Sequence, residues 1–290
     1  MGIWQDIRLR FVRLNNLEKI IAINVVFFVL PFILSTVLYL FKTSISEWFA
    51  YVELSANIGT VVFRPWTLLT YGFFHASIGH IFWNMMLLYI SGRLMLNLFK
   101  EKLLLNTFFV GIIAGGLTYL VSYNVFPVFS SVTGTLIGSS AGVMAVLIFM
   151  ASYMPNSPIR VFMFSIPLKY IALLFIFIDL VQIPQSNAGG HIAHLGGALW
   201  GYIYQRQFLR GNDIGAWFMY TYETLKKNFK GTPKSKRPKR PKRPKRRAKA
   251  TNSSAVDQKK IDAILDKIAS SGYESLTKGE KEYLFRAGKQ

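Results

Sequence analysis

Six long apolar stretches constrain the fold of this chain more than any other feature of its sequence. About 20 predominantly apolar residues are needed to cross the hydrocarbon core of a bilayer. The first stretch contains no charged residue, and the fourth is shorter because Pro155 ends it. Lipid offers the backbone no hydrogen-bond partners, so these stretches predict an all-α polytopic membrane protein with six transmembrane helices. The predicted spans are Ile20–Phe41, His80–Phe99, Leu103–Tyr123, Ser139–Met154, Ile166–Ile183 and Gly190–Tyr204.

The basic residues that flank these stretches predict an orientation. Short cytoplasmic loops carry an excess of Lys and Arg, and here the excess falls on alternate loops. This pattern predicts that both termini are cytoplasmic and that the membrane is the cell's inner or plasma membrane. The first stretch is too long for a signal-peptide core and has no small-residue cleavage site, so we expect an uncleaved signal-anchor. The basic residues concerned are Arg8, Arg10, Arg13, Lys19, Lys100, Lys102, Arg160, Lys169, Arg206 and Arg210.

More than half of the overall charge of +20 comes from one segment of the C-terminal tail, and not from the membrane domain. Residues 234–249 carry eleven Lys and Arg and no acid, and without them the formal charge falls to +9. The chain has no cysteine, which excludes disulfides, thiolate catalysis and cysteine-ligated metal sites. The sequence predicts neither a cofactor nor a metal.

Polar side chains inside apolar helices are expensive and by default mark a functional site. The chain has four histidines, and all four lie in or beside the predicted spans. Ser140 in Gly138-Ser-Ser-Ala-Gly142 is, taken alone, more typical of helix packing, because Gly138 and Gly142 form a small-xxx-small face. The alternative is a nucleophile at a helix start, where free backbone N–H groups suit an oxyanion.

Two further pairs of polar residues admit similar alternatives. His80 and Asn84 share one helix face, where they either hydrogen-bond between helices or stabilise an oxyanion. His191 and His194 also share a face, but few acids lie nearby to complete a metal shell. A close approach through the glycines of the same helix would instead bring His194 to Ser140, as activation of a serine by a base requires.

These motifs together resemble the rhomboid intramembrane serine proteases. The resemblance covers roughly residues 15–208 and rests on three signatures in the expected order. They are His75-Ala-Ser-Ile-Gly-His80-Ile-Phe-Trp-Asn84 in the second span, Gly138-Ser-Ser140 opening the fourth, and Ala193-His194-Leu-Gly-Gly197 with Gly201 in the sixth.

The resemblance implies a catalytic dyad without a carboxylate, in which Ser140 is the nucleophile and His194 the general base. It also implies that His80, Asn84 and the Ser140 backbone N–H stabilise the oxyanion. Asp179 in the fifth span could orient the base, but the family pattern requires no acid there, so it is expected to be a structural or interface residue. His191 is given no catalytic role. The expected supporting residues are Gly138, His75, Met144, Gly197 and Gly201.

The chain departs from the family pattern at three places. Ala141 follows the serine where a glycine is common. Met144 stands where an aromatic residue often stacks on the catalytic imidazole, although a sulfur–aromatic contact is open to it. The first loop reads Arg64-Pro65-Trp66-Thr67 instead of Trp-Arg, and its aromatic residues predict a segment in the membrane interface. None of these changes removes a group that performs chemistry.

The sequence predicts three domains: a transmembrane domain over 1–210, an interfacial and polybasic linker over 211–253, and a small cytoplasmic helical segment over 254–290. Three Pro-Lys-Arg repeats favour an extended chain, and the 234–249 run is expected to contact anionic lipid headgroups and not nucleic acid. In the last segment, Thr277-Lys-Gly-Glu280 has the form of a capping box. This segment resembles C-terminal extensions of some bacterial rhomboids.

The hypothesis from sequence is therefore an intramembrane serine endopeptidase that cleaves membrane proteins within or beside a transmembrane segment. One alternative is a catalytically inactive rhomboid-like protein that binds or escorts membrane clients. Another is a small-solute transporter that uses Asp179, which is disfavoured because no inverted repeat is evident.

Overall fold

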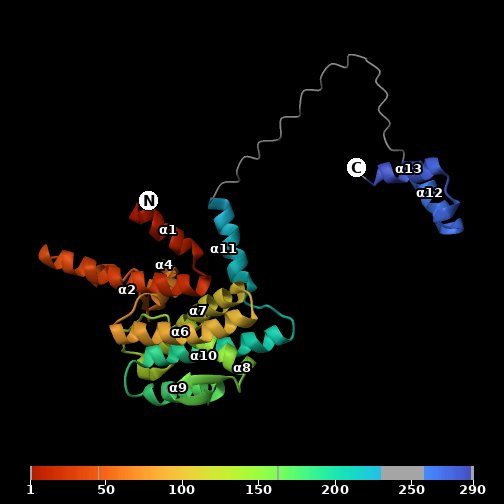
Figure 1. Cartoon of the computed structure of the whole chain (residues 1–290). Coiled ribbons are helices and arrows are strands. Elements are labelled where there is room, and N and C mark those ends of the chain that lie inside the picture. The colour runs from red at the N-terminus through yellow and green to blue at the C-terminus, as the bar shows by residue number, and fades with distance from the viewer. Residues whose placement is uncertain (1, 45, 162, 230–257, 289–290) are drawn as a thin grey trace. The chain divides into compact units, whose positions relative to one another are not determined.

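The computed structural model describes residues 2–44, 46–161, 163–229 and 258–288 of a mostly helical chain. The chain divides into two compact units, Met1–Pro233 and Lys234–Gln290, and Figure 1 labels their elements. The helices of the first unit are α1 Ile3–Arg13, α2 Asn16–Leu40, α3 Ser46–Phe49, α4 Ile58–Phe63, α5 Thr67–Thr70, α6 Ile78–Leu98, α7 Glu101–Val125, α8 Ser140–Tyr153, α9 Leu168–Gln182, α10 Ala188–Leu209 and α11 Ala216–Phe229.

Each of the six predicted apolar stretches contains one long helix, and these are α2, α6, α7, α8, α9 and α10. By length and hydropathy, α2, α6 and α7 are candidate membrane spans. In contrast, α8 has 14 residues and α9 has 15, so both are shorter than the roughly 20 residues of a full crossing. The histidines and glycines of α10 lower its hydropathy, although it has 22 residues.

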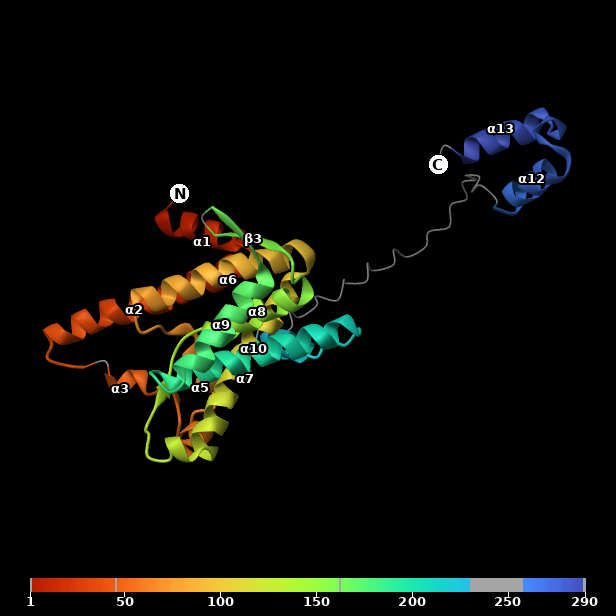
Figure 2. The same cartoon turned by 90° about the horizontal axis from the view of Figure 1, so that it is seen from below.

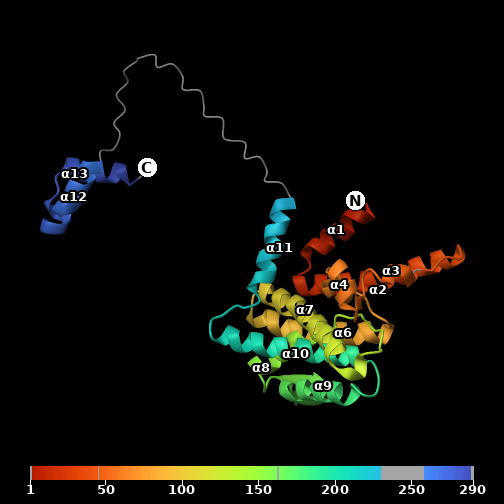
Figure 3. The same ribbon diagram turned by 180° about the vertical axis from the view of Figure 1, so that it is seen from behind.

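Helix α8 forms the centre of the helical bundle. It contacts α6, α7, α9 and α10, and eleven of its fourteen residues are buried. Figure 2, seen from below, shows α8 beside α9 and α10, and Figure 3, seen from behind, shows α9 lying along α10. The other helices therefore cover α8 on several sides, and Ser140, the first residue of α8, is half-buried among them.

Glycines set the spacing between α8 and its neighbours. A Cβ atom added to Gly197 of α10 would lie 2.0 Å from the carbonyl oxygen of Ala141, and one added to Gly201 would lie 2.2 Å from that of Ala145. On the α7 side, a Cβ on Gly111 would lie 2.4 Å from the Ala145 Cβ. The backbones of these helices thus approach at distances that no larger residue permits, as small-residue interfaces in membranes allow.

Two short strand pairs hold the loops that precede α8 and α9. Strand β1 (Leu54–Ser55) in the first loop pairs antiparallel with β2 (Thr135–Leu136), just before α8. Strands β3 (Pro158–Val161) and β4 (Phe164–Pro167) form an antiparallel pair between α8 and α9. The short 3₁₀ helices η1 (Tyr71–Phe73) and η2 (Pro127–Phe129) complete the loops. The first loop, predicted to be interfacial, is therefore partly ordered and is tied to the start of α8.

The described part of the second unit contains two helices. Helix α12 (Gln258–Ser271) and helix α13 (Lys278–Ala287) are joined by η3 (Tyr273–Ser275). The predicted capping box is confirmed, because the Thr277 side chain accepts from the backbone N–H of Glu280 and the Glu280 carboxylate accepts from that of Thr277. The Thr277 backbone N–H and the Lys267 ammonium keep the pKa of Glu280 below its usual value. The predicted polybasic run over 234–249 lies outside the described residues.

Candidate active site

Ser140 is the first residue of α8, and the chain reaches it through a glycine in a positive-φ conformation. Gly138 has a φ of +128°, which an L side chain rarely adopts, and its N–H donates to the Tyr71 carbonyl at 2.9 Å. The N-cap residue Ser139 makes no side-chain capping bond. The first N–H groups of a helix have no partner inside the helix, so the backbone at Ser140 offers donors beside the serine hydroxyl.

His80 and Asn84 lie on the first two turns of α6. The Ser77 hydroxyl caps this helix by accepting from the His80 backbone N–H at 3.1 Å. Asn84 is buried, and its Nδ2 has no hydrogen-bond partner in the described structure. A Cβ on Gly138 would lie 2.8 Å from His80 Nε2 and 3.5 Å from Ser140 Oγ. Only a glycine at 138 therefore leaves room for the His80 ring beside the serine.

His194 lies on the second turn of α10 and is bound to a carboxylate on α9. Its Nδ1 is 2.8 Å from Asp179 Oδ1, and Nδ1 of His191 lies at the same distance from the same oxygen. Asp179 is 4% exposed, and its second oxygen, Oδ2, has no hydrogen-bond partner among the described residues. The ring of His194 therefore makes its polar contact through Nδ1.

One cavity of about 530 Å³ brings the predicted chemical groups together. Ser140, His194, His80 and Asn84 all line it, together with Met144, and its walls come mainly from α6, α8 and α9. Within the described residues no hydrogen bond joins Ser140 Oγ to His194. Catalytic hydrogen bonds are often long in free enzymes and shorten when substrate binds.

The remaining supporting residues lie outside this cavity. His75 is buried, with Nε2 3.1 Å from Ser139 Oγ and its ring 5.0 Å from that of His80. It therefore contacts the residue before Ser140 and the ring of His80. Gly197 and Gly201 lie in the contact between α8 and α10, where they set the separation between Ser140 and His194.

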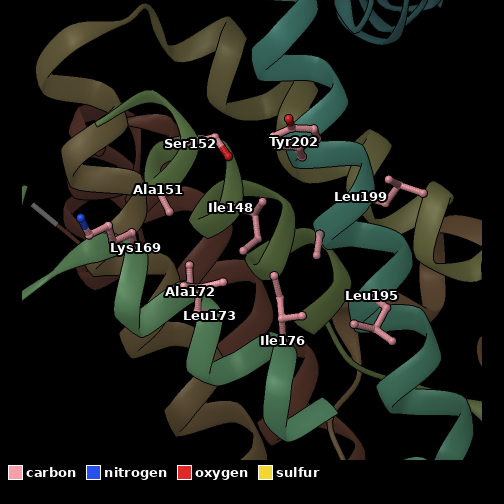
Figure 4. A pocket seen from close by; sticks show the side chains of 11 residues that line it. Ile148, Ala151, Ser152, Lys169, Ala172, Leu173, Ile176, Leu195, Leu199 and Tyr202 are labelled. Carbon is pink, nitrogen blue, oxygen red and sulfur yellow. The ribbon is translucent and has the colours of Figure 1, made fainter. Parts of the chain in front are cut away.

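A second cavity, of about 430 Å³, lies among α8, α9 and α10 (Figure 4). Its lining is apolar except for Lys169, Ser152 and Tyr202. None of the predicted site residues lines it. Because α9 contributes Leu174 and Phe175 to the first cavity and Leu173 and Ile176 to the second, this helix borders a cavity on two sides.

Asp179, His191 and His194 are the described residues whose donor atoms are spaced for a metal ion. One ligand atom from each lies within 4.8 Å of the other two. The two hydrogen bonds from the histidines to Asp179 already account for this spacing. We therefore treat the cluster as a hydrogen-bonded group.

Sequence reasoning considered Asp179 as an orienter but ranked it as a structural or interface residue, and the structure places it against His194. One signal pointed to it, because Asp179 is the one acidic residue between Glu101 and Asp213 in the sequence, and a lone acid in a membrane helix needs a partner. Trp83 in the cavity wall and Ser139 beside His75 were also missed. Neither differs in sequence from an ordinary helix-packing or helix-start residue.

Comparison with known proteins identifies the family of the chain. The family model for the Rhomboid domain matches residues 62–211, which is more than half of the chain. The chain belongs to the rhomboid family.

A second family model, a family of unknown function (DUF6576), matches residues 251–289. The chain is similar to RHOMBOID-like protein 12, mitochondrial, of Arabidopsis thaliana, with 28% identity over 148 residues. That alignment covers 47% of this chain and 44% of the relative, so the chain spans less than half the length of the curated relative it matches. With its apolar helices, the chain is a rhomboid-family membrane protein.

Proposed function

We propose that this chain is an intramembrane serine endopeptidase that cleaves membrane-protein substrates in or beside a transmembrane segment. The proposal rests on one observation, the cavity shared by Ser140, His194, His80 and Asn84. Such a cavity offers a nucleophile, a base and hydrogen-bond donors in one space, as acyl transfer requires.

In the proposed reaction, His194 Nε2 takes the Ser140 proton while Oγ attacks the scissile carbonyl carbon. The oxyanion accepts hydrogen bonds from Asn84 Nδ2, His80 and the Ser140 backbone N–H. The unpaired Asn84 Nδ2 supports this role, because a buried donor without a partner gains most when an oxyanion arrives. His194 then protonates the leaving amine, and water activated by the same imidazole hydrolyses the acyl-enzyme.

The same proposal includes a topology. Helices α2, α6, α7, α8, α9 and α10 span the inner or plasma membrane, with both termini and the C-terminal tail in the cytoplasm. The alternating basic loops support this orientation. The starts of α6, α8 and α10 then lie on the non-cytoplasmic side, where water enters the cavity. Residues 234–249 bind anionic lipid headgroups in this arrangement.

The direct test compares cleavage of a labelled transmembrane substrate by purified wild-type protein, Ser140→Ala and His194→Ala. We expect both variants to lose cleavage, and a fluorophosphonate to label Ser140. Ser91→Ala is the matched control, because Ser91 is a buried serine of α6 that does not line the cavity and whose hydroxyl donates to the Leu87 carbonyl of its own helix. Equal cleavage by the wild type and both active-site variants would disprove the assignment.

A second candidate is a catalytically inactive protein that binds or escorts membrane clients. The lack of a Ser140–His194 hydrogen bond in the described structure favours it. In the same assay such a protein would retain a transmembrane client without cutting it, and the fluorophosphonate would leave Ser140 unlabelled.

A further inference from the structure

The feature that the proposed dyad leaves unexplained is the buried carboxylate of Asp179. An acid near the end of a membrane helix is costly unless it is paired. Asp179 is paired only through Oδ1, which both His191 and His194 contact at 2.8 Å. Its partners are thus the proposed base and the histidine one turn before it.

These contacts fix which ring nitrogen of His194 carries the proton. A carboxylate oxygen can only accept a hydrogen bond, so the proton of the neutral imidazole lies on Nδ1. The lone pair then lies on Nε2, the nitrogen that must take the serine proton. In the opposite tautomer, Nε2 carries a proton and the ring cannot act as a base toward Ser140.

We propose that Asp179 is a positioning residue that completes a Ser140–His194–Asp179 triad, where the family resemblance implied a dyad. This inference rests on the proposed function, because it assigns His194 the role of base. Asp179 acts through His194, holding the ring in one orientation and one tautomer and stabilising the imidazolium that forms as Ser140 is deprotonated.

His191 gains a role in this arrangement. It lies on the same helix as His194 and donates to the same oxygen. Two donors from α10 hold the carboxylate of α9 in one rotamer, which one donor alone would leave free to turn. His191 therefore orients Asp179, and Asp179 orients His194.

The competing explanation is that Asp179 only ties α9 to α10. Both explanations predict that Asp179→Asn lowers stability. They differ in kinetics, because a tie has no effect on turnover by the molecules that remain folded. We expect folded Asp179→Asn to lose roughly 10²–10⁴-fold in kcat, with little change in KM, since an amide no longer enforces the Nδ1–H tautomer. His191→Asn is expected to lose less, because His194 keeps its own contact with the carboxylate.

Asp213→Asn is the matched control for this substitution. Asp213 also accepts a hydrogen bond from a buried partner, the Tyr204 hydroxyl, but it lies beyond the C-terminal end of α10 and outside the cavity lining. We expect this variant to lower the melting temperature and to keep kcat. An equal loss of kcat in Asp179→Asn and Asp213→Asn would show that neither acid positions the base.

The tautomer of His194 can be measured in the wild-type protein, with Asp179 in place. The chain has four histidines, so ¹⁵N-histidine labelling of the wild-type protein gives four imidazoles. The variants His75→Asn, His80→Asn and His191→Asn assign three of them by subtraction, and the remaining imidazole is that of His194. We expect His194 to carry its proton on Nδ1 at neutral pH.

The outcomes separate this inference from the proposed function. A proton on Nε2 of His194, or full kcat in folded Asp179→Asn, would overturn the triad while leaving the protease assignment intact. Cleavage that survives Ser140→Ala would overturn the protease assignment. If Asp179→Asn does not fold, a proton on Nε2 of His194 in the wild-type protein would still overturn the triad, and the kcat of folded His191→Asn supplies the kinetic comparison, because an unchanged kcat would leave only the tie between α9 and α10.

Discussion

The two neighbours of the proposed base differ sharply in how they are packed. On one side, α8 and α10 touch backbone to backbone through Gly197 and Gly201, with no space for a methyl group. On the other, α9 lies between two cavities, of about 530 and 430 Å³, and much of its surface is exposed. The proposed nucleophile and base therefore lie on helices in direct backbone contact, whereas Asp179 lies on a helix bordered by two cavities. We call the α8–α10 contact the tight side of the site and the cavity-lined helix α9 its loose side.

The largest effect is expected from breaking the tight side with Gly197→Val. Its Cβ would lie 2.0 Å from the Ala141 carbonyl oxygen, which is backbone and cannot turn away. We expect the variant to fail to fold, since even modest overpacking costs about 1–3 kcal/mol. Gly79→Val is the control, because nothing lies within 4 Å of a Cβ at Gly79. Thermal unfolding in detergent measures both, and a normal melting temperature for Gly197→Val would contradict the tight contact.

A second comparison measures the stability lost when one phenylalanine is removed from α8 or from α9. Phe149 of α8 is fully buried against Phe99, Tyr204 and Phe208, and Phe149→Ala is expected to cost about 3–5 kcal/mol. Phe177 of α9 is 62% exposed, and Phe177→Ala is expected to change stability by less than roughly 0.5 kcal/mol. Denaturant unfolding in mixed micelles gives both values. Similar costs would mean that α9 is packed as firmly as α8.

Gly138→Ala tests the turn that precedes Ser140 at the start of α8. The new methyl group would lie 2.7 Å from His80 Cε1, and the φ of +128° would be strained. We expect His80 to be displaced and kcat to fall about 10²–10³-fold, the loss of one oxyanion donor. Cleavage kinetics and the melting temperature of the same sample separate this from unfolding. Unchanged kcat would mean that His80 makes no contact with the oxyanion.

The smallest effect is expected from filling the loose side. Ala172 of α9 lines the 430 Å³ cavity (Figure 4), and Ala172→Val adds two methyl groups there. Cavity filling commonly stabilises a protein by about 0.5–2 kcal/mol, so we expect a small rise in melting temperature. Leu180→Val, at an exposed position of the same helix, is the control. A fall in stability for Ala172→Val alone would show that the space is already occupied.

The sequence predicted the helices better than it predicted their contacts. Apolar length located α2, α6, α7, α8, α9 and α10 to within a few residues, because a membrane helix is a local feature of the chain. Strands β1 and β2 were not predicted, since a two-residue strand has no alternation to detect and its partner lies about 80 residues away. The predicted fold therefore lacked the pairing that ties the first loop to the start of α8.

The site shows the same division. The motifs indicated Ser140, His194, His80 and Asn84, and the structure places all four around one cavity. The contact of Asp179 with His194 depends on how α9 turns its face toward α10. No local pattern encodes that rotation, so a lone acid was all that the sequence offered.

The shortness of α8 and α9 has a consequence for the surrounding bilayer. At 1.5 Å per residue, 15 residues extend only about 22 Å, whereas the hydrocarbon core is about 30 Å thick. In the proposed topology α9 crosses the membrane, so the bilayer beside its exposed face must thin to match it. Thinning brings headgroups and water toward the helix ends, and α9 carries Asp179 near its end. In the proposed function, the bilayer would therefore be thinnest at the point where hydrolysis needs water.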